Sequence, residues 1–111
     1  MDSKYSYLFS EKAEADLNDI IRYIAVTLSN PAAASDFIDR LLAVIDDTCL
    51  FPQSGTLAET EFIPDICIRK KPVGNYIVYY LPDESGSRII VLRILYSRCN
   101  LSEILTEINT Y

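Results

Sequence analysis

The spacing of apolar residues changes once along this sequence, near residue 66, and that change constrains the fold more than any other feature. From residue 11 to residue 49 apolar side chains recur at intervals of three and four, as they do on one face of a helix. From residue 66 to residue 96 they alternate or form short unbroken runs, as they do in strands. Helices followed by a group of strands predict an α+β domain.

Both predicted helices carry signals at their starts. Ser10 is a predicted N-cap for a helix of roughly 17 residues, and acidic residues in its first turn suit the helix dipole. Asn30 followed by Pro31 predicts the start of a second helix that runs toward Cys49. The two helices are expected to form a hairpin with a very short turn. Residues 52–65 are predicted to be a connecting loop.

The strands are predicted to form a small antiparallel sheet. Residues 4–9, rich in aromatic side chains, suit a first strand. The other expected elements are strands at 66–70, 76–81 and 88–96, turns at 72–75 and 83–86, and a short closing helix at 101–108. Gly86 is able to adopt a positive φ in the second of these turns. The apolar run from Ile89 to Leu92 predicts that the last strand lies inside the sheet and is covered on both faces.

Composition limits the class of protein. A chain of 111 residues that is 50% hydrophobic predicts one globular domain, residues 1–111, built on one core. It has no run of about 18 apolar residues and no secretion signal at its start, so we expect a cytoplasmic protein that does not contact a membrane. Cys49, Cys67 and Cys99 form no CxxC pattern, and we expect reduced thiols, no metal and no cofactor. The chain contains no histidine, the commonest general acid or base.

Charge is distributed unevenly along the chain. Residues 1–65 carry four basic and twelve acidic side chains, whereas residues 66–111 carry six basic and four acidic ones. With a net charge of −6 the protein is not expected to bind free DNA or RNA directly. The basic residues of the sheet suit an acidic peptide, a phosphate or an acidic protein surface, or they simply balance the acidic helices.

Candidate binding residues lie in this second half, and each has a structural alternative. The candidates are Arg69, Lys70, Lys71, Tyr76, Arg93 and Arg98. The three consecutive basic residues also suit an edge strand kept polar against unwanted pairing. Arg93 is expected to share a strand face with Ile89, Val91 and Leu95, and it needs either an internal acid such as Asp16 or Asp19 or an external partner. Tyr76 also suits packing on the sheet.

The order of these pieces resembles a known family. A strand, a helical hairpin and a three-stranded meander, together with the segments Pro72-Val73-Gly74-Asn75-Tyr76-Ile77-Val78-Tyr79-Tyr80 and Leu92-Arg93-Ile94-Leu95-Tyr96-Ser97-Arg98, look like the RelE/ParE superfamily of bacterial toxin–antitoxin toxins. The likeness runs from Tyr5 to about Leu105. It implies an α+β toxin of the plasmid-stabilisation type that a cognate antitoxin wraps and neutralises.

The resemblance implies one of two actions. Members similar to RelE cut messenger RNA on the ribosome, and members similar to ParE bind and poison DNA gyrase. As an enzyme the chain would be a ribosome-dependent endoribonuclease with an incomplete set of catalytic residues, because Ile77 replaces an arginine typical of the nucleases and Tyr96 stands where a histidine or basic residue is common. The remaining catalytic candidates are Tyr96, Arg98 and Arg69. The turn at 72–76 and the ending at 93–98 favour the ParE side.

The sequence leaves two further interpretations of the function open. One is a degenerate toxin that only binds its antitoxin, and the other is an interaction domain outside the family. The expected partners are therefore a cognate antitoxin and either DNA gyrase or the ribosome as target. We expect the antitoxin to cover the apolar hairpin face and a sheet edge, with its acidic residues against Arg69 to Lys71 and Arg98.

Overall fold

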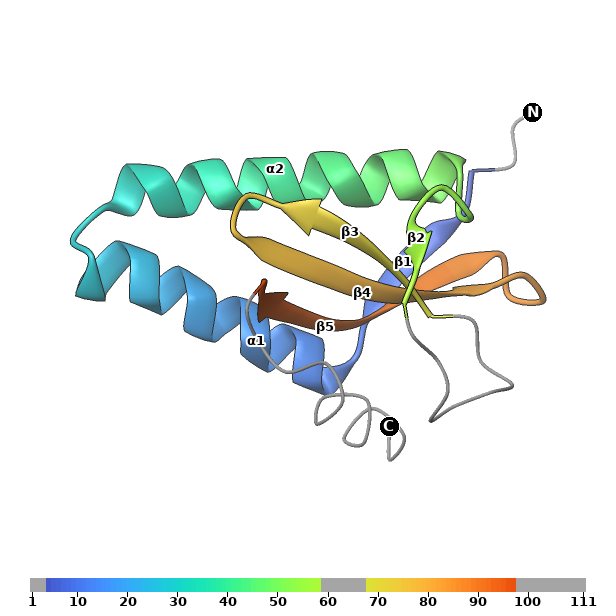
Figure 1. The fold of residues 1–111 in the computed structure, drawn as a ribbon, viewed down its shortest axis with the longest axis horizontal. Coiled ribbons are helices and arrows are strands. Elements are labelled where there is room, and N and C mark those ends of the chain that lie inside the picture. Colours follow the sequence, from blue (N-terminus) through green and yellow to red (C-terminus); the bar gives the residue numbers. More distant parts are fainter. Residues whose placement is uncertain (1–3, 59–67, 98–111) are drawn as a thin grey trace.

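The computed structural model describes residues 4–58 and 68–97, whose elements follow the expected order (Figure 1). They are β1 (Ser6–Phe9), α1 (Glu11–Arg22), the π-helical turn η1 (Tyr23–Thr27), α2 (Pro31–Leu50), β2 (Thr56–Leu57), β3 (Arg69–Val73), β4 (Tyr76–Asp83) and β5 (Arg88–Tyr96). A helical hairpin combined with one sheet confirms the α+β class.

Side-chain hydrogen bonds begin both helices at the positions that the sequence predicts. Ser10 Oγ accepts a hydrogen bond from the N–H of Ala13 (3.1 Å) and donates one to the carbonyl of Leu92 on β5 (2.9 Å). This cap therefore also joins α1 to the sheet. Asn30 Oδ1 accepts from the N–H of Ala33 (3.1 Å) at the start of α2. α1 and η1 together match the expected length of the first helix.

The five strands form one sheet in the order β1-β5-β4-β3-β2. β3, β4 and β5 are the predicted antiparallel meander, and β1 pairs with β5 in parallel. β2 was not predicted, because a strand of two residues inside a polar loop has no recognisable period. It adds a fifth strand by pairing Thr56 with Lys70 and Leu57 with Arg69.

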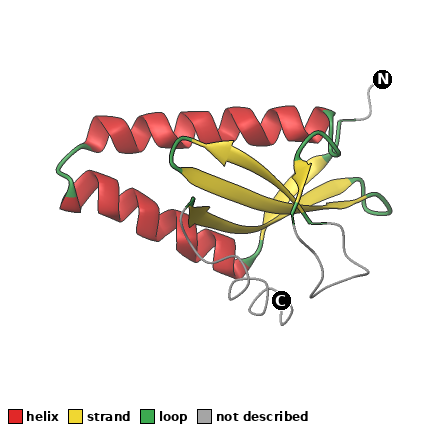
Figure 2. Ribbon diagram, in the orientation of Figure 1, coloured by secondary structure: helices red, strands yellow, loops and turns green. Residues whose placement is uncertain are grey.

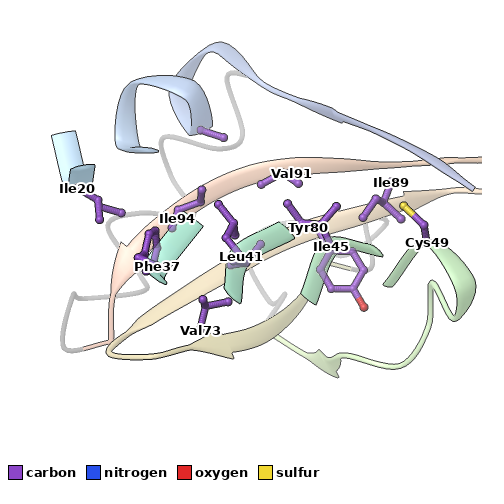
Figure 3. Close-up of a cluster of buried hydrophobic side chains, with 12 residues drawn as sticks. Ile20, Phe37, Leu41, Ile45, Cys49, Val73, Tyr80, Ile89, Val91 and Ile94 are labelled. Carbon is purple, nitrogen blue, oxygen red and sulfur yellow. The ribbon is translucent and has the colours of Figure 1, made fainter. Parts of the chain in front are cut away.

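α1 and α2 form an antiparallel pair beside the sheet (Figure 2), and the main core lies between the helices and one sheet face. Figure 3 shows this core, with Ile20, Phe37, Leu41, Ile45, Cys49, Val73, Tyr80, Ile89, Val91 and Ile94 labelled. The thiol of Cys49 is buried and free, as predicted. Cys67 and Cys99 lie outside the described residues.

The opposite face of the sheet carries a second apolar cluster. It consists of Ala58, Ile68, Tyr79, Ile90 and Leu92, each at most 6% exposed. The run from Ile89 to Leu92 therefore alternates between the two clusters, and all four of its side chains are buried. This confirms the prediction of an interior strand covered on both faces.

The first predicted turn of the meander is shorter than expected. β3 continues through Pro72 and Val73, so the turn consists of Gly74 and Asn75, with Gly74 at φ +60°. Pro72 is compatible with this strand because β2 pairs only with the first two residues of β3. Among the described strands, none pairs with the outer edge of β3 beyond these two residues, and a residue without an N–H donor is tolerated there.

In the second turn Gly86 does not use its capacity for a positive φ. The residue with positive φ is Ser87 (φ +50°). Gly86 instead leaves room for a carboxylate, because a Cβ at this position would lie 2.8 Å from Asp83 Oδ2. The carboxylate of Asp83 accepts hydrogen bonds from Ser85 Oγ (2.9 Å), the Gly86 N–H (3.3 Å) and Arg88 Nε (3.0 Å).

Because of these hydrogen bonds, we expect the turn to stabilise the fold less at acidic pH. The Ser85 hydroxyl, followed by the Arg88 guanidinium and the Gly86 N–H, holds the pKa of Asp83 below its ordinary value of 3.8. A carboxyl whose pKa is lower in the folded state stabilises the fold above its unfolded-state pKa, and this contribution is lost as pH falls through the folded-state pKa. We expect carbon-detected NMR to give a lower titration midpoint for Asp83 in the folded than in the unfolded chain. An Asp83→Asn variant should lose less stability than the natural chain between about pH 5 and pH 2. An unshifted midpoint would contradict this prediction.

Other expectations fall outside the described residues, namely the closing helix at 101–108 and the loop from residue 59 onward. Within residues 4–58 and 68–97, no helix combines the length and the apolar content that a membrane crossing requires.

Candidate functional site

The basic run of β3 is divided between the two faces of the sheet. Arg69 lies opposite Tyr80 of β4, on the face that the helices cover, and Lys71 lies on the same face. Lys70 lies opposite Tyr79, on the other face. Strand alternation therefore separates Lys70 from its two neighbours, and the three basic side chains do not form one patch.

Arg69 holds the loop that follows α2. Its Nη1 donates to the carbonyls of Gln53 (3.0 Å) and Gly55 (2.7 Å), and its Nη2 donates to Gln53 Oε1 (3.2 Å). Tyr80 Oη accepts from the Gly55 N–H (2.9 Å). Tyr80 is 1% exposed, and burial raises the pKa of its hydroxyl. The guanidinium that was predicted to bind a target thus has three acceptors within its own chain.

Lys71 joins β3 to α2. Its Nζ lies 3.2 Å from Asp47 Oδ2, and its side chain is 15% exposed whereas that of Asp47 is 59% exposed. This ion pair lies beside a shallow cavity of about 480 Å³ between α2, the following loop and β3. Of the described residues, the cavity is lined by Ala43, Val44, Asp47, Ser54, Gly55, Thr56, Lys70, Lys71 and Pro72.

Arg93 is paired with Asp16 of α1, the first of the internal acids considered from the sequence. Arg93 Nε and Nη2 donate to the two carboxylate oxygens of Asp16 at 2.7 and 3.0 Å. The N–H of Ile94 donates to Asp16 Oδ2 at 3.0 Å, so the carboxylate also satisfies the backbone of β5. The side chains of Arg93 and Asp16 are 12% and 14% exposed.

The strand face predicted for Arg93 is right for Leu95 but wrong for Ile89 and Val91, because the register shifts within β5. Tyr79 of β4 lies opposite Arg93, but Tyr80 lies opposite Val91, which leaves Leu92 as an extra residue. The shift reverses the alternation beyond Leu92, so Arg93 does not share a face with Ile89 and Val91. A single β-bulge cannot be recognised from the spacing of apolar residues in a sequence.

Tyr76 and Tyr96 meet at the far end of the sheet. They are partners across β4 and β5, and their rings lie 5.8 Å apart between centroids at 73°. Phe37 of α2 contacts the ring of Tyr76 in a similar edge arrangement (5.3 Å, 65°). Tyr23 of η1 lines the same cavity as these two tyrosines, although the sequence did not single it out. In the sequence, Tyr23 could be recognised only as a large aromatic residue close to the predicted turn between the two helices.

Two of the residues predicted for a nuclease, Arg69 and Tyr96, lie apart on the sheet. Arg69 lies opposite Tyr80 and Tyr96 lies opposite Tyr76, so the two candidates are separated by four residues along β4, roughly 13 Å. Arg98 lies outside the described residues. Within residues 4–58 and 68–97, no group of three or more Cys, Asp or Glu side chains is placed to hold a metal ion.

Comparison with known proteins supplies the family context. Residues 7–100 match the family model described as the ParE toxin of the type II toxin–antitoxin system parDE. No curated protein matches the chain.

Two solved structures are similar to this fold. The structure of the chromosomal ParDE toxin–antitoxin system from P. aeruginosa has a TM-score of 0.65 and 21% sequence identity, with 86% of this chain and 98% of the other covered. The RelBE2 toxin–antitoxin complex from Mycobacterium tuberculosis has a TM-score of 0.57 and 16% identity, with coverages of 84% and 98%. At these identities the structural likeness shows the fold.

Proposed function

Because the chain belongs to the ParE toxin family and is a toxin of the type II toxin–antitoxin class, we propose that it binds and inhibits DNA gyrase and that a cognate antitoxin neutralises it. Gyrase inhibition is the action that the sequence resemblance to ParE implies. It requires a binding surface and no catalytic set. The arrangement of the basic side chains favours such a mode of action.

The observation that carries the proposal is the internal use of these basic side chains. Ribonuclease chemistry needs cationic groups clustered around a phosphate, with an acid and a base nearby. Arg69 is bonded to Gln53 and Gly55, and Lys71 and Arg93 are bonded to carboxylates of the two helices. Groups already occupied by protein acceptors are poorly suited to receive the negative charge of a reacting phosphate.

The outer edge of β1 supports an antitoxin partner. β1 is the first strand of the sheet, and among the described elements it pairs only with β5. Ser6–Phe9 contains no charged residue and no proline, and Tyr7 and Leu8 are 48% and 36% exposed. An uncharged, open edge of this kind accepts an added strand. We propose that an extended segment of the antitoxin occupies it.

A supercoiling assay tests the proposed target. The purified protein is mixed with bacterial DNA gyrase, ATP and relaxed plasmid, and supercoiled and linearised DNA are quantified after denaturation of the enzyme. We expect loss of supercoiling, accumulation of cleaved plasmid, and recovery when the cognate antitoxin is added. A Lys70→Gln variant should inhibit less, since it changes the basic residue on the face away from the helices, whereas the charge-matched Arg22→Gln variant should inhibit normally.

The alternative target is examined in a second reaction. The same preparation is added to a cell-free translation system, and the 5′ ends of the translated message are mapped. Cuts in frame, together with unimpaired gyrase, would replace the proposal with the ribosome-dependent nuclease. Absence of both effects with a folded protein would leave a toxin fold that only binds its antitoxin.

A further inference from the structure

A cavity at the end of the sheet brings together three tyrosines from three elements. Among the described residues it is lined by Tyr23 of η1, Tyr76 of β4 and Tyr96 of β5, and its volume is about 490 Å³. Tyr23 and Tyr96 are 49% and 47% exposed, so a molecule approaching from solvent reaches both rings.

The rings stand at steep angles to one another. Tyr76 meets Tyr96 at 73° and is supported from the core side by Phe37 at 65°. Phe37 is buried, so this contact holds the ring of Tyr76 in place. Steeply inclined rings form a corner and not a pair of parallel plates. A corner lets a cation contact more than one ring at the same time, whereas a nucleobase stacks on the face of one ring.

The electrostatic environment also favours a cation. Aromatic faces are negative, and no charged side chain is among the described residues that line the cavity. Burial, together with the nearby Tyr23 and Tyr96, raises the pKa of Tyr76, so this ring stays neutral at physiological pH. The net charge of −6 of the whole protein also attracts cations and repels phosphates.

We propose that this cavity is a docking site for an arginine or lysine side chain of a protein partner, held by cation–π contact with Tyr23, Tyr76 and Tyr96. The bound cation contacts the aromatic rings of these three tyrosines and not a carboxylate. The site differs from the β1 edge proposed for strand addition, and the inference does not depend on gyrase being the target. It gives the acidic toxin a way to recognise a basic residue without a buried ion pair.

Solution NMR tests the proposal with a charged peptide and its neutral counterpart. The ¹⁵N-labelled protein is titrated with acetyl-Gly-Arg-Gly-amide and with the same peptide containing citrulline, which keeps the shape of arginine and removes its charge. We expect shift changes at the amides of Tyr23, Tyr76 and Tyr96, and binding of the citrulline peptide weaker by about fivefold. Tyr96→Leu and Tyr23→Leu should each weaken binding of the arginine peptide by a similar factor.

Phe51→Leu is the control, because Phe51 is an exposed aromatic residue (61%) that lies outside the cavity and outside the β1 edge. It should bind the arginine peptide as the unmodified protein does. Equal binding of the two peptides would overturn the proposal in favour of an apolar pocket. Adenosine is titrated as a third ligand, and if it bound more strongly than the arginine peptide, the cavity would instead be a site for a nucleobase. If the arginine peptide bound only to the Arg98→Gln variant, the cavity would be a site for Arg98 of the same chain. This result would also overturn the proposal. An absence of localised shifts would also refute the proposal.

Discussion

An Asp16→Ala variant is expected to unfold about 3 kcal/mol more easily than the natural chain. The substitution leaves the largely buried side chain of Arg93 (12% exposed) without its carboxylate, and it removes the acceptor of the Ile94 N–H. Losing one member of a buried pair is costly because the remaining charge was desolvated on folding and is no longer compensated. Urea denaturation followed by circular dichroism measures the change, and the melting temperature should fall by roughly 10–20 °C.

The matched control lies on the same helix. Asp19 pairs with Arg22 at the surface, and their side chains are 74% and 69% exposed. Asp19→Ala should change stability by less than about 0.5 kcal/mol. In a double-mutant cycle with Arg93→Met, we expect a coupling energy of about 2 kcal/mol for Asp16 and Arg93. Equal costs for Asp16→Ala and Asp19→Ala would show that the buried pair does not anchor α1 to β5.

Gly55→Ala is expected to destabilise the fold by about 3 kcal/mol, through overpacking. An added Cβ would lie 2.6 Å from Tyr80 Oη and 2.8 Å from the carbonyl oxygen of Lys70. The second atom belongs to the backbone of β3 and has little freedom to move. The loop must therefore shift, which also disturbs the hydrogen bonds that Arg69 and Tyr80 make with it. Urea denaturation again provides the measurement.

Two variants separate the contributions to this cost. Tyr80→Phe removes the hydroxyl but not the carbonyl of Lys70, so in that background Gly55→Ala should remain destabilising by about half as much. Gly86→Ala is the matched substitution elsewhere, since its Cβ would meet the end of a flexible side chain, Asp83 Oδ2. It should cost about 1 kcal/mol or less. A harmless Gly55→Ala would refute the close approach on which the prediction depends.

Much of the fold was predictable because its signals are local. The caps at Ser10 and Asn30 depend on residues three positions away, and the interior position of β5 is evident from its unbroken apolar run. The errors concern pairing. β2 is defined only by its partner strand, and β3 extends to Val73 because it pairs with β4 as far as Tyr76.

The candidate site was predictable to a smaller extent. Sequence identified Arg69, Lys71 and Arg93 as chemically significant, but their partners lie 14 to 77 residues away in the chain. A basic residue with an internal acceptor and one awaiting a target look alike in one sequence. Tyr23 was missed for the same reason, since it becomes significant only through its place beside Tyr76 and Tyr96.

The parallel pairing of β1 with β5 has a consequence for biosynthesis. The first strand completes its hydrogen bonds with the last described strand, and the bond from Ser10 to Leu92 spans 82 residues. Contacts between residues so far apart in sequence form late, because closing a long loop costs chain entropy before any contact compensates for it. A ribosome must therefore release residues up to about 96 before the sheet can close. The complete sheet is consequently expected to form only when nearly all of the described residues have been synthesised.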